Sequence, residues 1–537
     1  MRFNPPCSRA KFLHKSVTTL LLAAFSLAAC AQLVSQDVLT YHNANSRDGL
    51  NNQESILTLT NVNSASFGKL FTVAADGLVD AQPLIISNLV VQGASHNVLI
   101  VVTENDTVYA YDADTGANLW HVSALPYGET ASDDRGCSQV TPKIGITSTP
   151  VIVRPAGSNP VIYFVAMSKD SSGNYYQRLH ALDATTGAEL HNGPVVINAK
   201  YPGNGDNSSN GYVIFDPAQY KERAGLLLIG STVYLGWASH CDARPYTGWI
   251  MGYDINTLAQ TTVLNLTPNG NEGAIWGAGA GMAADGNGDI ILLDANGVFD
   301  TTLNTSGFPS DGDYGNAFLK IKTKGGLAVA DYFEMYNQSS ENGNDVDLGS
   351  GGTLLLYTKD SAGTILPLAV GAGKDSNLYV VNRNSMGKFN ADNNNAIYQE
   401  LAGALPGGVW SMPAAFNGRV YYGSVGAPIQ AFGLKNAKLE ATPVARTSNA
   451  FQYPGATPSI SANAGKNGIV WAVESSSPAV LHAYNAATLV ELYNSNQAAG
   501  ARDHFGNGNK FMTPTIANGK VYVGTPNSVA VFGLLSK

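Results

Sequence analysis

One short pattern recurs along the whole chain: a β-rich run that ends in a turn. The first copy, VYAYDADTGANLW (108–120), combines alternating small and large apolar residues with a turn at Asp112 and a Trp downstream. A softer copy, LHALDATTGAEL, begins at Leu179. Aligned on the turn, there are eight copies, 48 to 71 residues apart and centred on residues 112, 183, 254, 321, 382, 433, 485 and 533. Recurrence on this scale is typical of proteins built from repeated structural units.

The sequence around each copy predicts one four-stranded antiparallel sheet. Most copies follow a motif with Pro or Gly, such as AQPLIIS, and contain strands of four to six residues rich in Val, Ile, Leu and Tyr. The 57 glycines and the charged fraction of only 13% suit short strands joined by turns. A single sheet of this kind cannot bury both faces. We therefore predict an all-β fold, a single eight-bladed β-propeller with four-stranded antiparallel blades.

The ends of the chain predict how the ring closes. The last copy stops at Lys537 with room for only three strands. We expect the N-terminal strand KLFTVA (69–74) to complete the last blade. On this division residues 31–66 form an extension that lies on the ring, and residues 67–537 form the propeller. We expect the protein to be a monomer.

The complete first copy also predicts its own turn chemistry. Ala110 is small because strands crowd at this point, and Asp112 and Thr115 can hydrogen-bond to the turn backbone. Gly116 supplies the positive φ that the turn needs. We expect Trp120 to stack between blades, with its N–H bonded across to the next one.

The first thirty residues predict a targeting segment. Four basic residues precede the apolar run TTLLLAAFSLAAC, which is too short to span a membrane as a lasting helix. The stretch LAAC, ending at Cys30, resembles a bacterial lipobox, and cleavage before Cys30 would leave a lipid-bearing cysteine. Ordinary cleavage before Gln32 would instead release a free secreted protein. We expect export to the periplasm, outer membrane or cell surface, with a lipid anchor as the only membrane contact.

The charge of the chain limits the classes of molecule that it is expected to bind, and its cysteine content allows a disulfide. The net charge is −9, and no basic cluster follows the first fifteen residues, which argues against nucleic-acid binding. A protein or a small-molecule ligand remains as the expected partner. Beyond the leader the chain has two cysteines, Cys137 and Cys241, and an oxidising compartment allows them to pair.

The first copy is similar to the A-x-D-x-x-T-G-x-x-x-W tryptophan-docking repeat of quinoproteins. These eight-bladed propellers include the pyrroloquinoline-quinone (PQQ) alcohol dehydrogenases, and the resemblance covers residues 67–537. Only the first copy is complete, because His191 and Tyr493 stand where a Trp would be. The resemblance implies a cofactor site on the propeller axis, with PQQ, a neighbouring Ca²⁺ and an aspartate base.

Individual segments carry this resemblance to particular residues. AIWGAGAGM implies that Trp276 is the aromatic floor of the site, and DANG implies that Asn296 is a Ca²⁺ ligand. SDGDYGNAFLKI places Asp313 at the catalytic base and at a Ca²⁺ oxygen. GAGKDSNLYVVNR places Lys374 at the cation that pairs with the quinone oxygens, and ASHCDARPYTGW places Asp242 near the ligand glutamate. Oxygen ligands of this kind suit Ca²⁺.

Several positions depart from the family pattern. The adjacent cysteine pair of the family has become Cys137-Ser138, and its Arg is Thr247. Cys241 falls one residue from the ligand position. Both cysteines therefore map to the same axial mouth, and we predict that their Cα atoms lie within about 7 Å, in disulfide reach.

Each proposed site residue also has a plainer role. Trp276 can be inter-blade core, Lys374 can be a solvated loop residue, and the Asn and Asp residues can cap turns. The acidic stretch ENGNDVDLGSGG lacks EF-hand spacing and is interpreted as a loop.

Two functions follow from this balance. One is a non-catalytic propeller, used for binding or scaffolding, with a vestigial PQQ site. The other is a PQQ- and Ca²⁺-dependent dehydrogenase that oxidises an alcohol or a sugar in the periplasm. The axial residues favour the enzyme, whereas the broken cysteine pair and the missing Arg favour the binding protein, which is the interpretation we prefer.

Overall fold

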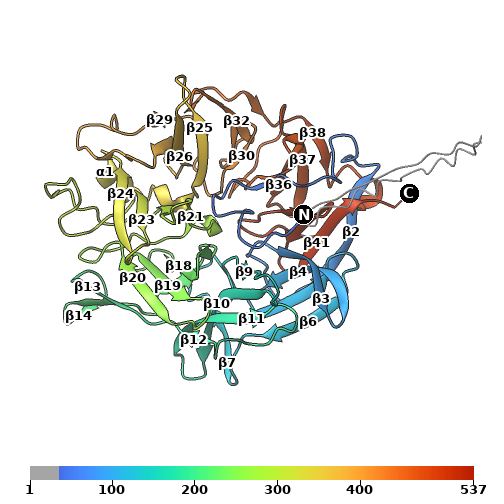
Figure 1. Ribbon diagram of the computed structural model, residues 1–537, viewed down its shortest axis with the longest axis horizontal. Coiled ribbons are helices and arrows are strands. Elements are labelled where there is room, and N and C mark those ends of the chain that lie inside the picture. Colours follow the sequence, from blue (N-terminus) through green and yellow to red (C-terminus); the bar gives the residue numbers. More distant parts are fainter. Residues whose placement is uncertain (1–35, 537) are drawn as a thin grey trace, which may run out of the picture. The chain divides into compact units, whose positions relative to one another are not determined.

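The computed structural model describes residues 36–536, and the leader with Cys30 lies outside the described residues. The described chain is almost entirely β, with one short helix, α1 (Gln338–Gly343), and three 3-10 turns, η1 (Gly277–Gly279), η2 (Leu348–Ser350) and η3 (Ala499–Ala501). Eight antiparallel sheets follow one another around a centre in chain order (Figure 1). The predicted β-propeller with eight blades is confirmed.

The first four blades use residues 84 to 334. Blade 1 contains β3 (Leu84–Val91), β4 (Ala94–Val102), β5 (Thr107–Asp112) and β6 (Asn118–Ser123); blade 2 contains β9 (Val151–Val153), β10 (Val161–Asp170), β11 (Tyr175–Asp183) and β12 (Val195–Val196), extended by β7 (Glu129–Asp133) and β8 (Lys143–Ile144). Blade 3 contains β17 (Leu227–Ile229), β18 (Thr232–Ser239), β19 (Trp249–Asp254) and β20 (Gln260–Asn265), with β16 (Tyr220–Glu222) also paired to β18. Blade 4 contains β21 (Ala283–Ala284), β22 (Ile290–Leu293), β23 (Phe318–Lys322) and β24 (Ala328–Glu334), with β28 (Lys388–Phe389) beside β24.

The other four blades complete the circle. Blade 5 contains β25 (Leu354–Lys359), β26 (Ile365–Gly371), β27 (Leu378–Asn382) and β29 (Gln399–Leu401); blade 6 contains β30 (Ala414–Phe416), β31 (Arg419–Tyr422), β32 (Gln430–Lys435), β33 (Lys438–Leu439) and β34 (Ala445–Arg446). Blade 7 contains β35 (Ser459–Asn463), β36 (Lys466–Glu474), β37 (Val480–Asn485) and β38 (Glu491–Asn494), and blade 8 contains β39 (Thr515–Ala517), β40 (Lys520–Gly524), β41 (Ser528–Leu534) and β2 (Phe67–Ala74). A separate small sheet joins β13 (Lys200–Pro202), β14 (Ser208–Ser209) and β15 (Tyr212–Ile214).

The ring closes as the sequence predicts. Strand β2 pairs antiparallel with β41, from Phe67 opposite Leu534 to Ala74 opposite Ser528. The strand begins two residues before the expected 69–74. Because β2 supplies the fourth strand of blade 8, it ties the N-terminal part of the propeller to the C-terminal part and removes an exposed sheet edge.

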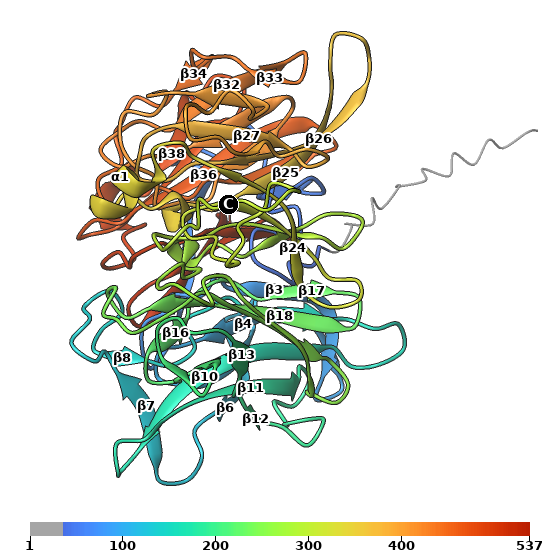
Figure 2. The same ribbon diagram turned by 90° about the vertical axis from the view of Figure 1, so that its left-hand side faces the viewer.

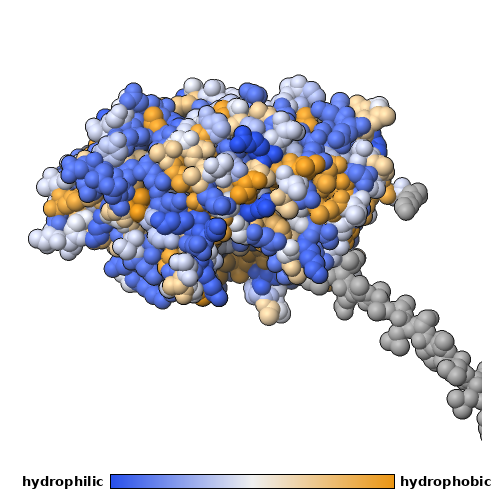
Figure 3. All heavy atoms as spheres, turned by 90° about the horizontal axis from the view of Figure 1, so that it is seen from above, coloured by the Kyte–Doolittle hydropathy of each residue, from blue (hydrophilic) through white to orange (hydrophobic). Residues whose placement is uncertain are grey.

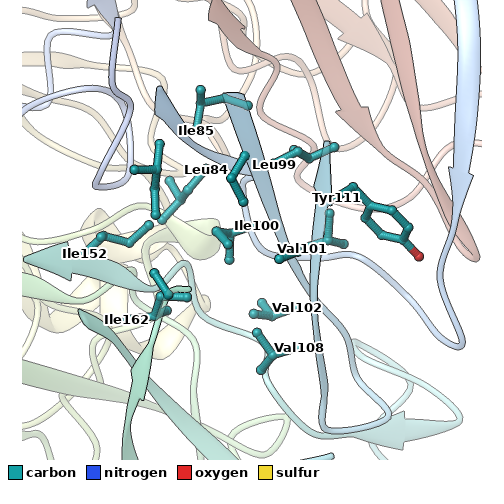
Figure 4. Packing of buried hydrophobic residues seen from close by; sticks show 14 of the residues in the cluster. Leu84, Ile85, Leu99, Ile100, Val101, Val102, Val108, Tyr111, Ile152 and Ile162 are labelled. Carbon is teal, nitrogen blue, oxygen red and sulfur yellow. The ribbon is translucent and has the colours of Figure 1, made fainter. Parts of the chain in front are cut away.

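Blades pack face to face through branched apolar side chains. Residues 98–102 of β4 are all buried, so both faces of this strand are covered. Figure 4 shows the contact between the first two blades, where Ile152 and Ile162 lie close to Leu84 and Ile100. Burying strands on both faces explains why the repeat is a run of Val, Ile and Leu rather than a strict alternation.

The repeat turn has the predicted geometry. The Asp112 carboxylate accepts the N–H groups of Asp114 and Thr115 at 2.9 and 2.7 Å, and Gly116 has φ +77°. Trp120 donates its ring N–H to the carbonyl of Ala184 in blade 2 at 3.1 Å. A Cβ on Gly187 would lie 2.8 Å from the Trp120 ring, so the glycine of the second copy makes room for the tryptophan of the first.

The segment 36–54 crosses the first strand of every blade. Strand β1 (Leu50–Asn51) pairs with β35, and one or two hydrogen bonds reach the first strand of each other blade. The pairs are Val38 with Ile85, Leu39 with Ile152, Asn45 with Leu228 and Ala284, Ser46 with Leu355, Asp48 with Ala415, Gly49 with Ile460, and Asn51 with Ile516. We call residues 36–54 the plug, because a segment bonded to all eight first strands covers the axis of the ring.

The two ends of the ring carry different structures. In the edge-on view, β7, β8 and α1 lie at one end, and the β25–β26 hairpin projects from the other (Figure 2). Polar residues cover most of the side shown in Figure 3, where apolar residues form small separate groups. Within residues 36–536, no helix is long and apolar enough to cross a membrane.

Candidate functional site

A pocket of about 140 Å³ lies on the axis of the ring. Its lining comes from the β7–β8 loop, from the segments just before the first strands of blades 3 to 8, from the end of β18 and the residues after it, and from the segment after β26. Arg223 and Phe511 of this pocket also line a much smaller cavity together with Tyr41 of the plug. The pocket therefore has the plug behind it and the blade loops around it.

A disulfide borders this pocket. Cys137 and Cys241 are bonded, with their Cα atoms 5.6 Å apart, which confirms the predicted pairing. Cys137 lies in the β7–β8 loop and is buried, whereas Cys241 follows β18 and is exposed at the pocket. The bond thus joins an extension of blade 2 to blade 3.

Two of the predicted site residues, Trp276 and Lys374, both line the pocket and lie near each other. The Lys374 ammonium lies 6.0 Å from the centre of the Trp276 ring and makes ion pairs with Asp345 at 2.8 Å and Asp347 at 2.5 Å. Burial acts to lower the pKa of Lys374, but the two carboxylates outweigh it and the pKa lies above its ordinary value. Burial raises the pKa of Asp347 to about 6, against the attraction of Lys374.

Asp242 and Asn296 occupy the border of the same site. Asp242 lines the pocket, and its carboxylate accepts the hydroxyl groups of Ser239 at 2.9 Å and Tyr246 at 3.2 Å. Asn296 donates its backbone N–H to Asp347 at 2.8 Å, and its side-chain Oδ1 is buried without a hydrogen-bond partner in the part of the chain that the structure describes.

The fifth predicted residue, Asp313, is not part of the pocket. Its carboxylate accepts the backbone N–H of Asn269 at 2.9 Å and so holds a neighbouring loop. Burial raises its pKa to about 6. The carboxylate in the pocket is instead Asp347, from the stretch that the sequence analysis interpreted as a plain loop. The stretch is a loop between the end of α1 and β25, interrupted only by η2, as interpreted, but this loop also brings Asp347 to the pocket.

A positional signal existed for Asp347. Trp276 and Asp347 each lie seven residues before the first strand of their blade, which begins at Ala283 and Leu354 respectively. Trp410, Tyr453 and Phe511, which also line the pocket, precede the first strands of blades 6, 7 and 8 by a few residues. Aligning the repeats on these strand starts would have placed all of these side chains on one end of the axis.

Two buried cations were missed by the sequence analysis. Lys221 and Arg223 line the pocket from β16 and the residue after it, and only 3% and 4% of their surfaces are exposed. Burial, together with repulsion from Arg223, lowers the pKa of Lys221 to about 7. Within residues 36–536, the Nε and Nη1 atoms of Arg223 have no hydrogen-bond partner. The signal was the run KER shortly before the apolar strand β17.

Aromatic rings accompany the cations of this region. The Arg223 guanidinium lies 4.4 Å from the centre of the Phe511 ring, and the Lys510 ammonium lies 6.0 Å from that of Tyr453. With Lys374 and Trp276 they make three cation–aromatic pairs around one pocket. Such pairs present flat faces and positive charge together, which suits a planar anion.

The donors do not form the predicted Ca²⁺ site. Among the described residues, no group of three His, Cys, Asp or Glu side chains is arranged to hold a metal ion. Asp313 lies outside the pocket, and Lys374 already neutralises Asp345 and Asp347. Asp242, Asn296 and Asp313 are therefore not gathered around one point.

Comparisons with known proteins show similarity in the fold alone. No protein-family model matches the sequence, and no curated protein matches it. Among solved structures, the quinohemoprotein alcohol dehydrogenase from Comamonas testosteroni is similar with a TM-score of 0.60 at 14% identity, over 93% of this chain and 80% of that one. The alcohol dehydrogenase ADHIIG from Pseudomonas putida HK5 has a TM-score of 0.59 at 13% identity, over 93% and 81% of the two chains. A europium-containing methanol dehydrogenase has a TM-score of 0.59 at 12% identity, over 93% and 98%. The chain shares its propeller fold with these enzymes.

Proposed function

We propose that this chain is an exported binding propeller whose axial pocket takes a flat, anionic aromatic molecule of the quinone carboxylate class. The observation that carries the proposal is the pair of buried cations, Lys221 and Arg223, beside aromatic rings. The carboxylates of Asp80 and Glu104 attract Arg223, but two of its guanidinium nitrogens still make no hydrogen bond among the described residues. A buried polar group without a partner is costly, and a bound anion would remove that cost. Rings such as Trp276 and Phe511 would hold the planar part of the ligand.

PQQ, a flat quinone with three carboxyl groups, fits this set of residues. Trp276 would lie against its ring system, Lys374 would point to quinone oxygens, and Lys221 and Arg223 would pair with carboxylates. When bound, the group would supply a two-electron acceptor. The exposed Cys241 and the buried Lys221 would border it on the side of blade 3.

The residues of the pocket suit a divalent cation less well than they suit PQQ. A hard cation such as Ca²⁺ takes six to eight oxygen ligands. The Asn296 Oδ1 is one unpartnered oxygen here, but the nearby carboxylates of Asp345 and Asp347 are paired with Lys374. We therefore propose binding that does not depend on Ca²⁺.

The second candidate is a dehydrogenase, and Asp347 is the observation that favours it. Its carboxylate lies in the pocket with Trp276 and Lys374, and its pKa of about 6 leaves it mostly ionised at neutral pH. A carboxylate in this state can accept the proton of an alcohol or sugar hydroxyl. In this function Asp347 replaces Asp313 as the base, and Lys374 holds it in place.

Export is part of the proposal. A disulfide is expected in an oxidising compartment, and the pairing of Cys137 with Cys241 supports that location. Replacing Cys30→Ala should abolish lipid labelling and release the protein into the soluble fraction. A wild-type protein that is already soluble and begins at Gln32 would contradict the anchor but not the export.

The test is a titration of the full chain with PQQ, followed by tryptophan fluorescence, with and without Ca²⁺. We expect saturable binding in both conditions, and Arg223→Met should weaken it about 100-fold, because a charge-assisted contact in a buried pocket is lost. The matched control is Arg446→Met, since Arg446 is an exposed arginine on β34 that does not line the pocket.

A dye-linked dehydrogenase assay on the same samples separates the two candidates. Binding without turnover of ethanol or glucose supports the binding protein. Turnover that Asp347→Asn removes supports the enzyme. No saturable binding, or equal affinity of the Arg223→Met variant, would contradict both.

A further inference from the structure

The two sulfur atoms of the disulfide lie in different surroundings. Only 2% of Cys137 is exposed, whereas Cys241 is exposed at the border of the pocket. A thiolate from solution can therefore approach Cys241 but not Cys137. In thiol–disulfide exchange, the attacked sulfur and the leaving sulfur have different requirements, and this asymmetry assigns one role to each.

A lysine stands beside the buried sulfur. The Lys221 ammonium lies 3.6 Å from Cys137 Sγ, and within residues 36–536 this is its one hydrogen-bonding contact. A neighbouring cation lowers the pKa of a cysteine thiol and stabilises its thiolate. In its protonated form, Lys221 therefore favours Cys137 as the leaving thiolate and offsets the cost of burying that charge.

The backbone at the exposed sulfur is strained. Cys241 and Asp242 both have positive φ, +48° and +54°, a region that side-chain-bearing residues rarely adopt. Two consecutive residues in this region have a conformational cost that the surrounding structure must hold in place. Opening the bond to Cys137 would remove one of the restraints on this turn.

We propose that the Cys137–Cys241 disulfide is exchange-active, with Cys241 as the sulfur that is attacked and Cys137 as the leaving thiolate, held by Lys221. A thiolate of a small thiol or a dithiol protein bonds to Cys241 Sγ while the Cys137–Cys241 bond breaks and its electron pair stays on Cys137. A second thiol then releases Cys241 and forms the external disulfide. In total, two thiols are oxidised to one disulfide, and the protein disulfide is reduced to two thiols.

This exchange would also control the pocket, an extension that rests on the proposed function. Lys221 lines the pocket and is a proposed partner of the anionic ligand. Once the Cys137 thiolate forms, it pairs with Lys221 and competes with the anionic ligand for this cation. We expect the reduced protein to bind PQQ about tenfold more weakly than the oxidised protein.

The test uses the oxidised full chain with glutathione and no ligand, trapped by alkylation and analysed by peptide mass spectrometry. We expect glutathione on Cys241 and an alkylated Cys137. Lys221→Met should slow the reaction about tenfold, because the leaving thiol becomes more basic. Lys221→Arg keeps a cation there and should retain most of the rate. Lys143→Met is the matched control, since Lys143 is an exposed lysine in the adjacent strand β8.

The other outcomes overturn the proposal. Glutathione on Cys137, equal rates for wild type and Lys221→Met, or no reaction until the protein is denatured would each make the bond a plain structural link. If Lys221→Met does not fold, comparing Lys221→Arg with Lys221→Gln gives the same test. The exchange is measured without ligand, so its result does not depend on PQQ binding. Either proposal can therefore fail while the other holds.

Discussion

Two buried arginines near the axis of the ring differ in how their charge is satisfied. Arg47, in the plug, donates to the carbonyls of Met282, Tyr41 and Leu226 at 2.9, 2.7 and 3.2 Å and to the Thr40 hydroxyl at 2.8 Å. Arg223, in the pocket, has two guanidinium nitrogens that are buried without a partner among the described residues.

The difference separates a structural cation from a binding cation. Arg47 is fully buried, and burial lowers its pKa to about 10, but its hydrogen bonds join the plug to blades 3 and 4. Arg223 is nearly as buried and contributes no such link. A buried cation whose hydrogen bonds are made within the protein stabilises the fold. A buried cation that lacks hydrogen-bond acceptors needs a ligand to supply them. Three predictions follow, in order of decreasing effect.

Arg47→Met should lower the free energy of unfolding by about 3–5 kcal/mol. The substitution leaves several buried carbonyl groups without a donor, and each such loss costs about 1–3 kcal/mol. Thermal unfolding followed by circular dichroism measures the effect, with Arg446→Met as the control, since Arg446 is an exposed arginine on β34. A midpoint equal to that of the wild type would mean that the plug does not hold the ring together.

The affinity for an anionic ligand should fall as the pH rises above about 7, by up to tenfold per unit. The pKa of Lys221 is about 7 in the protein without ligand, and a bound anion favours the ammonium form, so binding takes up a proton. Asp347 does not add to this slope because its pKa is about 6. Titrations at pH 7, 8 and 9 give the dependence.

Lys221→Met should make this pH profile flat. A profile with the same slope in the variant would show that another group titrates. The contribution of Arg47 to the free energy of unfolding should stay constant between pH 7 and 9, because the pKa of Arg47 is about 10.

Arg223→Met should leave the stability unchanged or raise it by about 1 kcal/mol. Asp80 and Glu104 attract Arg223, but two of its nitrogens make no hydrogen bond among the described residues, so an apolar side chain of similar volume removes a desolvation cost that these carboxylates only partly offset. The same thermal measurement applies. A loss as large as that of Arg47→Met would show that Arg223 is structural, and would remove the main support for the ligand.

Much of the fold was predictable because its signals are local. The eight turns, the short apolar strands and the missing fourth strand of blade 8 all lie within stretches of a few residues, and each was found. The disulfide was predicted from two positions that a family resemblance brought to one mouth. Trp276 and Lys374 were found for the same reason, since each lies in a segment with a recognisable pattern.

The carboxylate of the site was not predictable in the same way. Asp313 and Asp347 both lie in stretches rich in Asn, Asp and Gly, and nothing in their immediate neighbours distinguishes a turn cap from a pocket residue. The distinction depends on the distance to the next first strand, which decides whether a loop reaches the axis.

By itself, the sequence determined the number of blades and the missing strand that closes the ring, because the repeat period and the turn chemistry are local signals. The pairing of Cys137 with Cys241 was predicted from the family resemblance. Only the tertiary structure decided which charges are satisfied. The carbonyls that complete Arg47 belong in part to Leu226 and Met282, 179 and 235 residues away, and backbone carbonyls are the same at every position in a sequence. The sequence also does not show that Arg223 lacks hydrogen-bond partners, because this follows from the way the loops of several blades meet around one axis.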